Sequence, residues 1–143
     1  MDDVDRTIIA HLSQDARISL AVLARRMKVA RSTIQARLER LETTGVIAGY
    51  TIRLGETART SRIRASVLLA IEPRSQAGIL SRLKAIAQIE RIHTTSGRID
   101  LLLHLSTNST AELDEVLDRI SVIEGVRSLE SLVHLSTRLD RAV

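Results

Sequence analysis

The side chains with the clearest chemical role are basic and hydrogen-bonding residues between positions 25 and 40. Arginine can pair with guanine O6 and N7, and glutamine with adenine N6 and N7, so these residue types can read base edges in the major groove. We expect base contacts from the start of a helix beginning near position 31, from Arg31, Ser32, Thr33, Gln35 and Arg37. We expect phosphate contacts, which position a protein on DNA without reading sequence, from Arg25, Arg26, Lys28 and Arg40.

The charge of the chain is concentrated in the part that holds these residues. From Arg17 to Arg64 there are 11 basic and 3 acidic residues, a net charge of +8. From Ala65 to the end there are 9 basic and 10 acidic residues, a net charge of −1. This asymmetry is typical of a nucleic-acid-binding unit joined to a unit with another role. Charge alone leaves open a basic surface that is merely solvated.

The composition argues against several other classes of site. The 143 residues include no cysteine, which excludes disulfides and zinc–thiolate centres. Tyr50 is the only aromatic residue, so stacking of single-stranded bases is not expected and duplex DNA is favoured. No apolar run approaches the roughly 18–20 residues that span a membrane, and the acidic start MDDVDR does not resemble a secretion signal. We therefore expect a cytoplasmic protein with no membrane partner.

Three helices are predicted within residues 1–48. The first is capped by Asp2 or Asp3, and the second by Ser19. The third runs from about position 31 to 44 and ends at Gly45. Their apolar faces are Val4, Ile8 and Leu12, then Leu20, Leu23, Ala24 and Met27, then Ile34, Leu38 and Leu41.

The second and third helices are separated by a turn of only three residues, 28–30. Two helices joined in this way, the second amphipathic and basic outside, are typical of the helix-turn-helix unit. Residues 46–52 around Gly49 predict a short hairpin or strand, so we assign 1–52 to a winged helix-turn-helix domain. A winged helix used only for protein contacts is the alternative.

Residues 53–62 have few apolar side chains and no periodicity, which predicts a linker. Beyond it, residues 63–143 alternate between strand and helix patterns. Strands are predicted at 63–71, 89–95, 99–105 and 126–135, and helices at 75–87 and 110–123. The order β-α-β-β-α-β predicts a ferredoxin-like domain with both helices on one face of a four-stranded antiparallel sheet. The chain as a whole is therefore expected to be an α+β protein.

The face of this sheet away from the helices is predicted to be half apolar. Strand alternation places Leu102 and His104 there, together with Leu68 and Ala70. Such a face is commonly an oligomer interface, so we expect a dimer formed by packing of two sheets. His93, His104 and His134 also lie on strands and are candidates for this face. They form either a metal-binding or pH-sensing cluster, or three separate hydrogen-bonded interface residues.

The segment ISLAVLARRMKVARSTIQARLERLETTGVIAGY resembles the N-terminal domain of the Lrp/AsnC (leucine-responsive, feast/famine) regulators. Asp5 before it and Gly45-Val46-Ile47 at its end are further marks of this resemblance. Gly97-Arg98-Ile99-Asp100 and Glu124-Gly125-Val126 are similar to motifs of that family's effector domain. The chain departs from the family pattern at Ala30, where a capping serine is usual, and at Lys28, where glycine is usual.

The resemblance implies a small effector, usually an amino acid, bound between subunits near a hairpin at 95–100. Hydroxyls, exposed backbone amides, a guanidinium and a carboxylate suit such a ligand. The residues are Thr94, Thr95, Ser96, Gly97, Arg98 and Asp100. An ordinary polar turn is the alternative. The resemblance also implies homodimers that assemble further, into an oligomer such as an octamer.

The sequence thus predicts a sequence-specific DNA-binding transcriptional regulator that responds to a small metabolite and needs no cofactor. An Lrp-like haem-pathway decarboxylase is one alternative, because such enzymes resemble the same two-part fold. A metabolite-binding oligomer without DNA-binding activity is another. No nucleophile–base pair, phosphate-binding glycine loop or metal-ligand spacing is apparent, so an enzyme is not expected.

Overall fold

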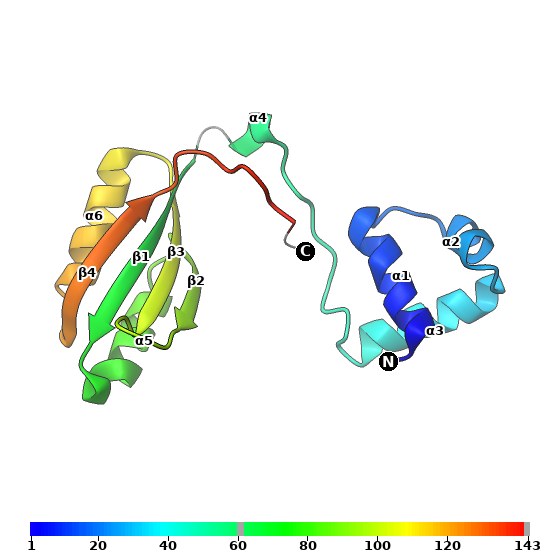
Figure 1. Ribbon diagram of the computed structural model, residues 1–143, viewed down its shortest axis with the longest axis horizontal. Coiled ribbons are helices and arrows are strands. Elements are labelled where there is room, and N and C mark those ends of the chain that lie inside the picture. Colours follow the sequence, from blue (N-terminus) through cyan, green and yellow to red (C-terminus); the bar gives the residue numbers. More distant parts are fainter. Residues whose placement is uncertain (60–61, 142–143) are drawn as a thin grey trace. The chain divides into compact units, whose positions relative to one another are not determined.

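The computed structural model of the protein describes residues 1–59 and 62–141. Residues Met1–Arg53 and Leu54–Asp140 belong to two compact units, which we describe separately. Figure 1 shows three helices in the first unit and a sheet with helices in the second. Within the described residues, no helix has both the length and the apolar character needed to cross a membrane.

The three predicted N-terminal helices are confirmed. They are α1 (Asp3–Gln14), α2 (Leu20–Met27) and α3 (Arg31–Thr43). Asp2 caps α1 in a capping box, because its carboxylate accepts from the Asp5 backbone while the Asp5 carboxylate accepts from the Asp2 backbone. The Ser19 hydroxyl caps α2 by accepting from the Val22 N–H at 3.1 Å. Helix α2 ends at Lys28, whose φ of 54° lies in the left-handed region that favours glycine.

The core of the first unit is small and aliphatic. Each helix contributes side chains that the sequence pattern had placed on its apolar face. The fully buried members are Ile8, Leu23, Ala24, Ile34 and Leu41. This packing fixes the angle between α2 and α3, and so determines which side of α3 faces outward.

The hairpin predicted around Gly49 is wrong. Residues 44–55 contain neither helix nor strand, so the described helix-turn-helix unit has no β wing. Val46, Tyr50 and Ile52 are at least half exposed, and a two-stranded hairpin without a packing surface is only marginally stable. The Tyr50 hydroxyl instead donates to Glu42 at 2.6 Å, and burial together with this bond raises the pKa of Tyr50 to about 12.

The segment predicted as an unstructured linker contains the short helix α4 (Glu56–Arg59). It begins after Gly55, whose carbonyl accepts from the N–H groups of Ala58 and Arg59. Residues 60 and 61 of the predicted linker lie outside the described residues.

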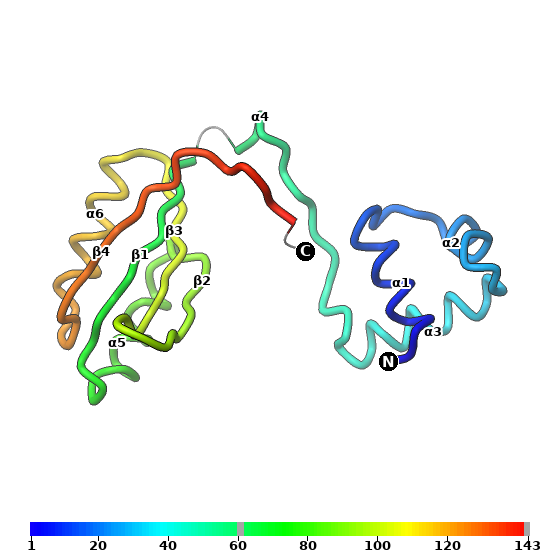
Figure 2. Tube along the Cα trace, viewed as in Figure 1, coloured from blue at the N-terminus to red at the C-terminus, as the bar shows by residue number. Residues whose placement is uncertain are grey.

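The second unit has the predicted β-α-β-β-α-β order. Its strands are β1 (Ile63–Ile71), β2 (Ile89–Thr94), β3 (Leu101–Thr107) and β4 (Val126–Val133). Its longer helices are α5 (Gln76–Lys84), preceded by a 3-10 turn at Pro73–Ser75, and α6 (Thr110–Ser121). The strands are antiparallel in the order β2-β3-β1-β4, so β1 and β3 lie in the middle (Figure 2).

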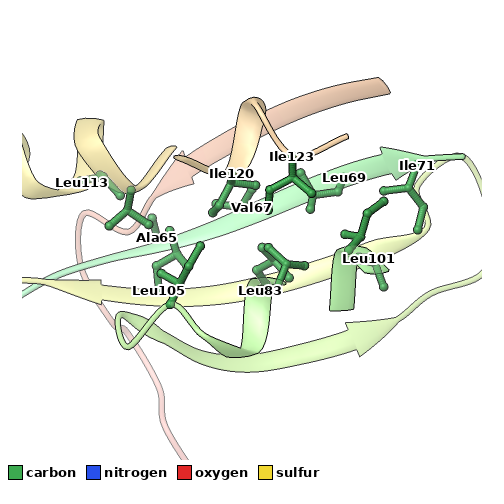
Figure 3. Packing of buried hydrophobic residues seen from close by; sticks show 14 residues of the cluster. Ala65, Val67, Leu69, Ile71, Leu83, Leu101, Leu105, Leu113, Ile120 and Ile123 are labelled. Atoms are coloured by element: carbon green, nitrogen blue, oxygen red, sulfur yellow. The ribbon is translucent and has the colours of Figure 1, made fainter. Parts of the chain in front are cut away.

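Side chains along β1 and β3 point alternately to the two faces of the sheet, and those on one face are buried. Cross-strand neighbours such as Val67 and Leu103 are fully buried against α5 and α6, in the core that Figure 3 shows. Ile79 and Leu83 of α5 and Leu113, Val116 and Ile120 of α6 complete that core. The opposite face, which we call the open face, comprises Arg64, Ser66, Leu68, Ala70, Arg91, His93, Leu102, His104, Ser128, Glu130 and Leu132.

Candidate nucleic-acid interface and ligand site

Helix α3 begins without a side-chain cap. Ala30 occupies the N-cap position with an extended backbone and offers no acceptor, and the first turn holds no acidic residue. Arg31, Ser32 and Thr33 surround this helix end, and all three are exposed. A helix N-terminus carries partial positive charge and unpaired N–H groups, which together attract phosphate. This end of α3 is therefore suited to an anion.

The outward face of α3 is polar. Ile34 and Leu41 point into the core, so the opposite side of the helix carries Ser32, Gln35, Ala36 and Glu39. The Gln35 side-chain amide donates to the Glu39 carboxylate at 3.2 Å, one turn further along. A shallow surface depression beside this face is lined by Ser32, Thr33, Ala36, Arg37 and Arg40. This face therefore carries both hydrogen-bond donors and acceptors.

Arg37 and Arg40 are held by acidic residues of α1. Arg37 Nη1 lies 2.6 Å from an Asp2 carboxylate oxygen and 3.0 Å from Asp5, and Arg40 Nη2 lies 2.7 Å from Asp5. The Asp5 side chain is fully buried, whereas that of Arg37 is 26% exposed and that of Arg40 56% exposed. We call Asp2, Asp5, Arg37 and Arg40 the α1–α3 ion-pair network. It attaches α3 to α1.

The network changes the titration of its members. The bond from Arg37 is the main reason that the pKa of Asp2 falls to about 2. Burial by itself would raise the pKa of Asp5, but the bonds from the Asp2 backbone and Arg37 and the charge of Arg40 lower it overall. The pKa of Arg37 is raised by its bonds to Asp2 and Asp5. Asp2, Asp5 and Arg37 are therefore charged at neutral pH.

The sequence analysis expected Arg37 to contact bases and Arg40 to contact phosphate, but did not anticipate their shared partner. One signal was available. Asp5 lies three and seven residues before Ile8 and Leu12, on the apolar side of α1. A buried carboxylate needs a cationic or hydrogen-bonding partner, so an acid at such a position indicates an ion pair across the core.

The other predicted phosphate-binding residues have no such partner. Arg25 and Arg26 lie at the end of α2, and Lys28 lies in the turn. Within residues 1–59 and 62–141, none of the ion pairs involves these three side chains or Arg31. All four are exposed. These four cations, at the end of α2, in the turn and at the start of α3, are thus available to an anionic ligand.

The predicted ligand site lies in the connection between β2 and β3. The Asp100 N–H donates to Leu69 O, and its carboxylate accepts from the Ile71 N–H, both at 2.8 Å. The Thr95 hydroxyl donates to the Ile99 carbonyl at 2.8 Å. Thr95 and one carboxylate oxygen of Asp100 therefore shape the loop and attach it to β1.

The remaining predicted ligand-site residues are exposed. Gly97 has a φ of +102°, a backbone conformation that residues with a side chain rarely adopt. Arg98 is 77% exposed and lies 3.6 Å from the Glu130 carboxylate, a loose surface pair that a ligand carboxylate can replace. Thr94 and Ser96 are also exposed. The loop thus presents a guanidinium, hydroxyls and backbone groups to solvent.

The three strand histidines lie near one another on the open face of the sheet. The rings of His93 and His104 are 5.5 Å apart between centroids, at an interplanar angle of 83°. The His134 Nε2 and the Ser66 hydroxyl are 2.8 Å apart. In the part of the chain that the structure describes, no three His, Cys, Asp or Glu side chains converge as metal ligands. The geometry therefore gives no support to the metal-binding alternative.

Comparison with protein families matches both units. Residues 1–42 match the model of the AsnC-type helix-turn-helix domain, and residues 64–143 match the Lrp/AsnC ligand binding domain. The HTH-type transcriptional regulator FL11 of Pyrococcus furiosus is 29% identical over 94% of this chain and 89% of its own length. The HTH-type transcriptional regulator LrpA of Mycobacterium tuberculosis is 29% identical over 93% of this chain and 89% of its own length.

Solved structures show the same architecture. The leucine response regulatory protein LrpA of Mycobacterium tuberculosis superposes with a TM-score of 0.80 at 28% identity, over 100% of this chain and 98% of its own. E. coli AsnC has a TM-score of 0.89 at 23% identity, over 100% of this chain and 97% of its own, and shows the fold alone. The predicted combination of a helix-turn-helix unit and a four-stranded antiparallel domain is confirmed.

Proposed function

Because the chain belongs to the Lrp/AsnC family of DNA-binding transcriptional regulators, we propose that it reads duplex DNA with the outward face of α3 and responds to an amino acid. Its C-terminal unit is of the ligand-binding type. The related proteins are transcriptional regulators rather than enzymes, which leaves the decarboxylase alternative without support.

The proposed base contacts come from Ser32, Thr33 and Gln35, with Arg31 beside them. The supporting observation is the uncapped, acid-free start of α3 at Arg31, preceded by Arg25 and Arg26 at the end of α2 and by Lys28 in the turn. No ion pair between described residues engages these four cations. Because the major groove accepts one helix, the N-terminal residues of α3 approach base edges while these cations contact phosphates. Arg40 keeps an exposed guanidinium edge for a phosphate, whereas Arg37 mainly orients the helix.

The proposed assembly is a homodimer formed through the open face of the sheet, with dimers associating further into an oligomer such as an octamer. Leu68, Leu102 and Leu132 give this face an apolar centre, and Leu132 is 50% exposed. Arg91 lies on the β2 side and Glu130 on the β4 side. A twofold interface must be self-complementary, and opposite charges at opposite edges meet that requirement. The two helix-turn-helix units of a dimer would then bind two DNA half-sites separated by whole turns of the double helix.

The proposed ligand site is the loop at 94–100, with an amino acid as the effector. Arg98 would pair with the ligand carboxylate, and the Gly97 backbone and the hydroxyls of Thr94 and Ser96 would hydrogen-bond to it. The carboxylate oxygen of Asp100 that does not accept from Ile71 would receive the ammonium group. Binding would alter DNA affinity to the extent that the ligand prefers one arrangement of subunits over another.

The experiment that tests this proposal is a fluorescence anisotropy titration of the full chain onto the duplex upstream of its own gene. The titration is run at several salt concentrations, with a scrambled duplex alongside. We expect preference for the native duplex and a steep loss of affinity with salt, about 0.9 log units per log unit of salt for each phosphate neutralised. Repeating it with single amino acids identifies the effector. Failure to bind either duplex at low salt would contradict the proposal.

A further inference from the structure

The open face of the sheet carries a group of ionisable side chains that neither the DNA contacts nor the ligand site uses. Its centre is the pair His93 and His104, on neighbouring strands, with ring centroids 5.5 Å apart. Ser66 lies directly opposite His104 on β1, and its hydroxyl lies 2.8 Å from His134 Nε2. The three imidazoles therefore lie around one short stretch of β1. We call them the histidine cluster.

The side chains around the histidine cluster include aliphatic groups that do not solvate charge. Leu68 and Leu102 are cross-strand partners on this face, and His93 lies opposite Leu102. Leu132 lies opposite Ser66. Protonating two adjacent imidazoles on such a face places like charges side by side beside aliphatic groups, which is unfavourable and becomes more so when water is excluded.

The charged groups nearby do not neutralise the histidine cluster. On β2, Arg91 opposes protonation of His104, and the carboxylate of Glu90 only partly offsets it. On β4, the Glu130 carboxylate is already shared with Arg98 at 3.6 Å. The β1 strand contributes Arg64, one more cation, opposite Ser106. Burial first, and then the neighbouring His93 and His134, lower the pKa of His104 even in the single chain.

We propose that the histidine cluster makes self-association through the open face sensitive to pH, so that acidification separates the subunits. The inference rests on the proposed sheet-to-sheet dimer. In the associated state the imidazoles would be dehydrated and held neutral. The separated subunits would bind protons more readily, because water then solvates the imidazolium. Mass action therefore favours separation as pH falls and the separated subunits take up protons.

The linkage between proton binding and association gives the direction of the pH effect. A histidine whose pKa is lower in the associated state contributes full stability to that state above its pKa in the separated subunit, and this stability is lost as pH falls toward the lower value. For His104 the pKa of the separated subunit already lies below the ordinary 6.5, so the loss occurs below pH 6.5. Each unit of pKa difference corresponds to a factor of about ten in the equilibrium constant per histidine. A dimer would contain two copies of the histidine cluster. The dissociation constant is therefore expected to rise at least about tenfold between pH 7.5 and 5.5.

The test is sedimentation equilibrium of the full chain at pH 7.5 and 5.5, with circular dichroism at both values. The principal variant replaces His93, His104 and His134 by glutamine, which keeps a polar side chain but cannot titrate. His11→Gln, on α1 and outside the open face, is the matched control. We expect wild type and His11→Gln to dissociate on acidification while remaining folded, and the triple variant to associate equally at both pH values. His93→Gln/His104→Gln provides a milder variant should the triple variant fold poorly.

Two outcomes would overturn the switch itself. One is a wild-type dissociation constant that is the same at both pH values, and the other is a triple variant that still dissociates on acidification. A Leu68→Arg variant tests the interface separately, because it places a charge at the centre of the open face. Association that survives Leu68→Arg at pH 7.5, or a wild type that is monomeric there, would refute the proposed interface and the switch with it.

Discussion

Replacing Asp5 by alanine is expected to lower the melting temperature of the N-terminal unit by roughly 10 °C and to weaken DNA binding at least tenfold. The Asp5 carboxylate is fully buried and pairs with Arg37 at 3.0 Å and Arg40 at 2.7 Å. Its removal releases Arg40 and leaves Arg37 with Asp2 alone, so the polar attachment of α3 to α1 is reduced to one more exposed ion pair. Thermal unfolding followed by circular dichroism, together with anisotropy on duplex DNA, measures both effects.

The control is Asp3→Ala on the same helix. The Asp3 side chain is 96% exposed and pairs only with Arg6, at 3.2 Å, among the ion pairs of the described residues. Both substitutions remove one negative charge near the start of α1. Only Asp5→Ala also removes the buried ion pairs and the bond from the Asp2 N–H, so a difference between the variants measures these interactions together. Equal melting temperatures for the two variants would show that the ion-pair network does not stabilise the unit.

The same network predicts how the N-terminal unit responds to acid. The pKa of Asp2 is lowered to about 2, and that of Asp5 is also lowered, from an ordinary value of 3.8. The stability these carboxylates contribute is therefore present above pH 3.8 and is lost as pH falls toward 2. In Asp5→Ala this acid-dependent part of the stability should shrink.

Replacing Gly125 by alanine is expected to destabilise the C-terminal unit by about 3 kcal/mol or more. Gly125 has a φ of +95°, and a Cβ there would overlap the Ser75 Cβ and lie 2.6 Å from the Ser75 Oγ. The turn cannot simply move away, because the Gly125 carbonyl accepts from the Glu72 N–H at 2.8 Å. Urea unfolding measured by circular dichroism gives the free energy.

Gly78→Ala is the matched control for this prediction. Gly78 lies within α5, has no heavy atom within 4 Å of an added Cβ, and should gain roughly 0.5–1 kcal/mol from the better helix former. A second arm, Gly125→Ala/Ser75→Gly, removes the overlap but keeps the strained φ, so partial recovery is expected. A Gly125→Ala variant as stable as the wild type would refute the close approach of the two turns.

Local pattern was sufficient to predict most of the fold. Alternation placed Val67, Leu69, Leu101 and Leu103 on the helix side of the sheet, and all four are fully buried there. Such patterns succeed because each face of a strand has one environment over its whole length. The hairpin around Gly49 was predicted wrongly: Ile47 packs against the core of this unit, but Val46, Tyr50 and Ile52 remain at least half exposed.

The functional residues were harder to predict from sequence. Residue type and position on α3 suggested DNA contact for Arg31 and Arg37 alike, but only the structure separates them. Arg31 has no ion pair with a described residue, whereas Arg37 is joined to Asp2 and Asp5, 35 and 32 positions away. Asp100 likewise is a typical ligand-binding type, yet its carboxylate accepts from the Ile71 backbone. Such long-range partners leave no periodic signal.

Base reading by the outward face of α3 is tested most directly with a Ser32→Ala/Gln35→Ala variant. Anisotropy measures how strongly this variant prefers the native duplex over the scrambled one. Neither residue is charged, so we expect the preference to fall about tenfold or more while the salt dependence is unchanged. Arg26→Ala is the complementary variant, expected to weaken both duplexes alike and to reduce the salt slope by about 0.9. A double variant that keeps the full wild-type preference would contradict the claim that the outward face of α3 reads the bases.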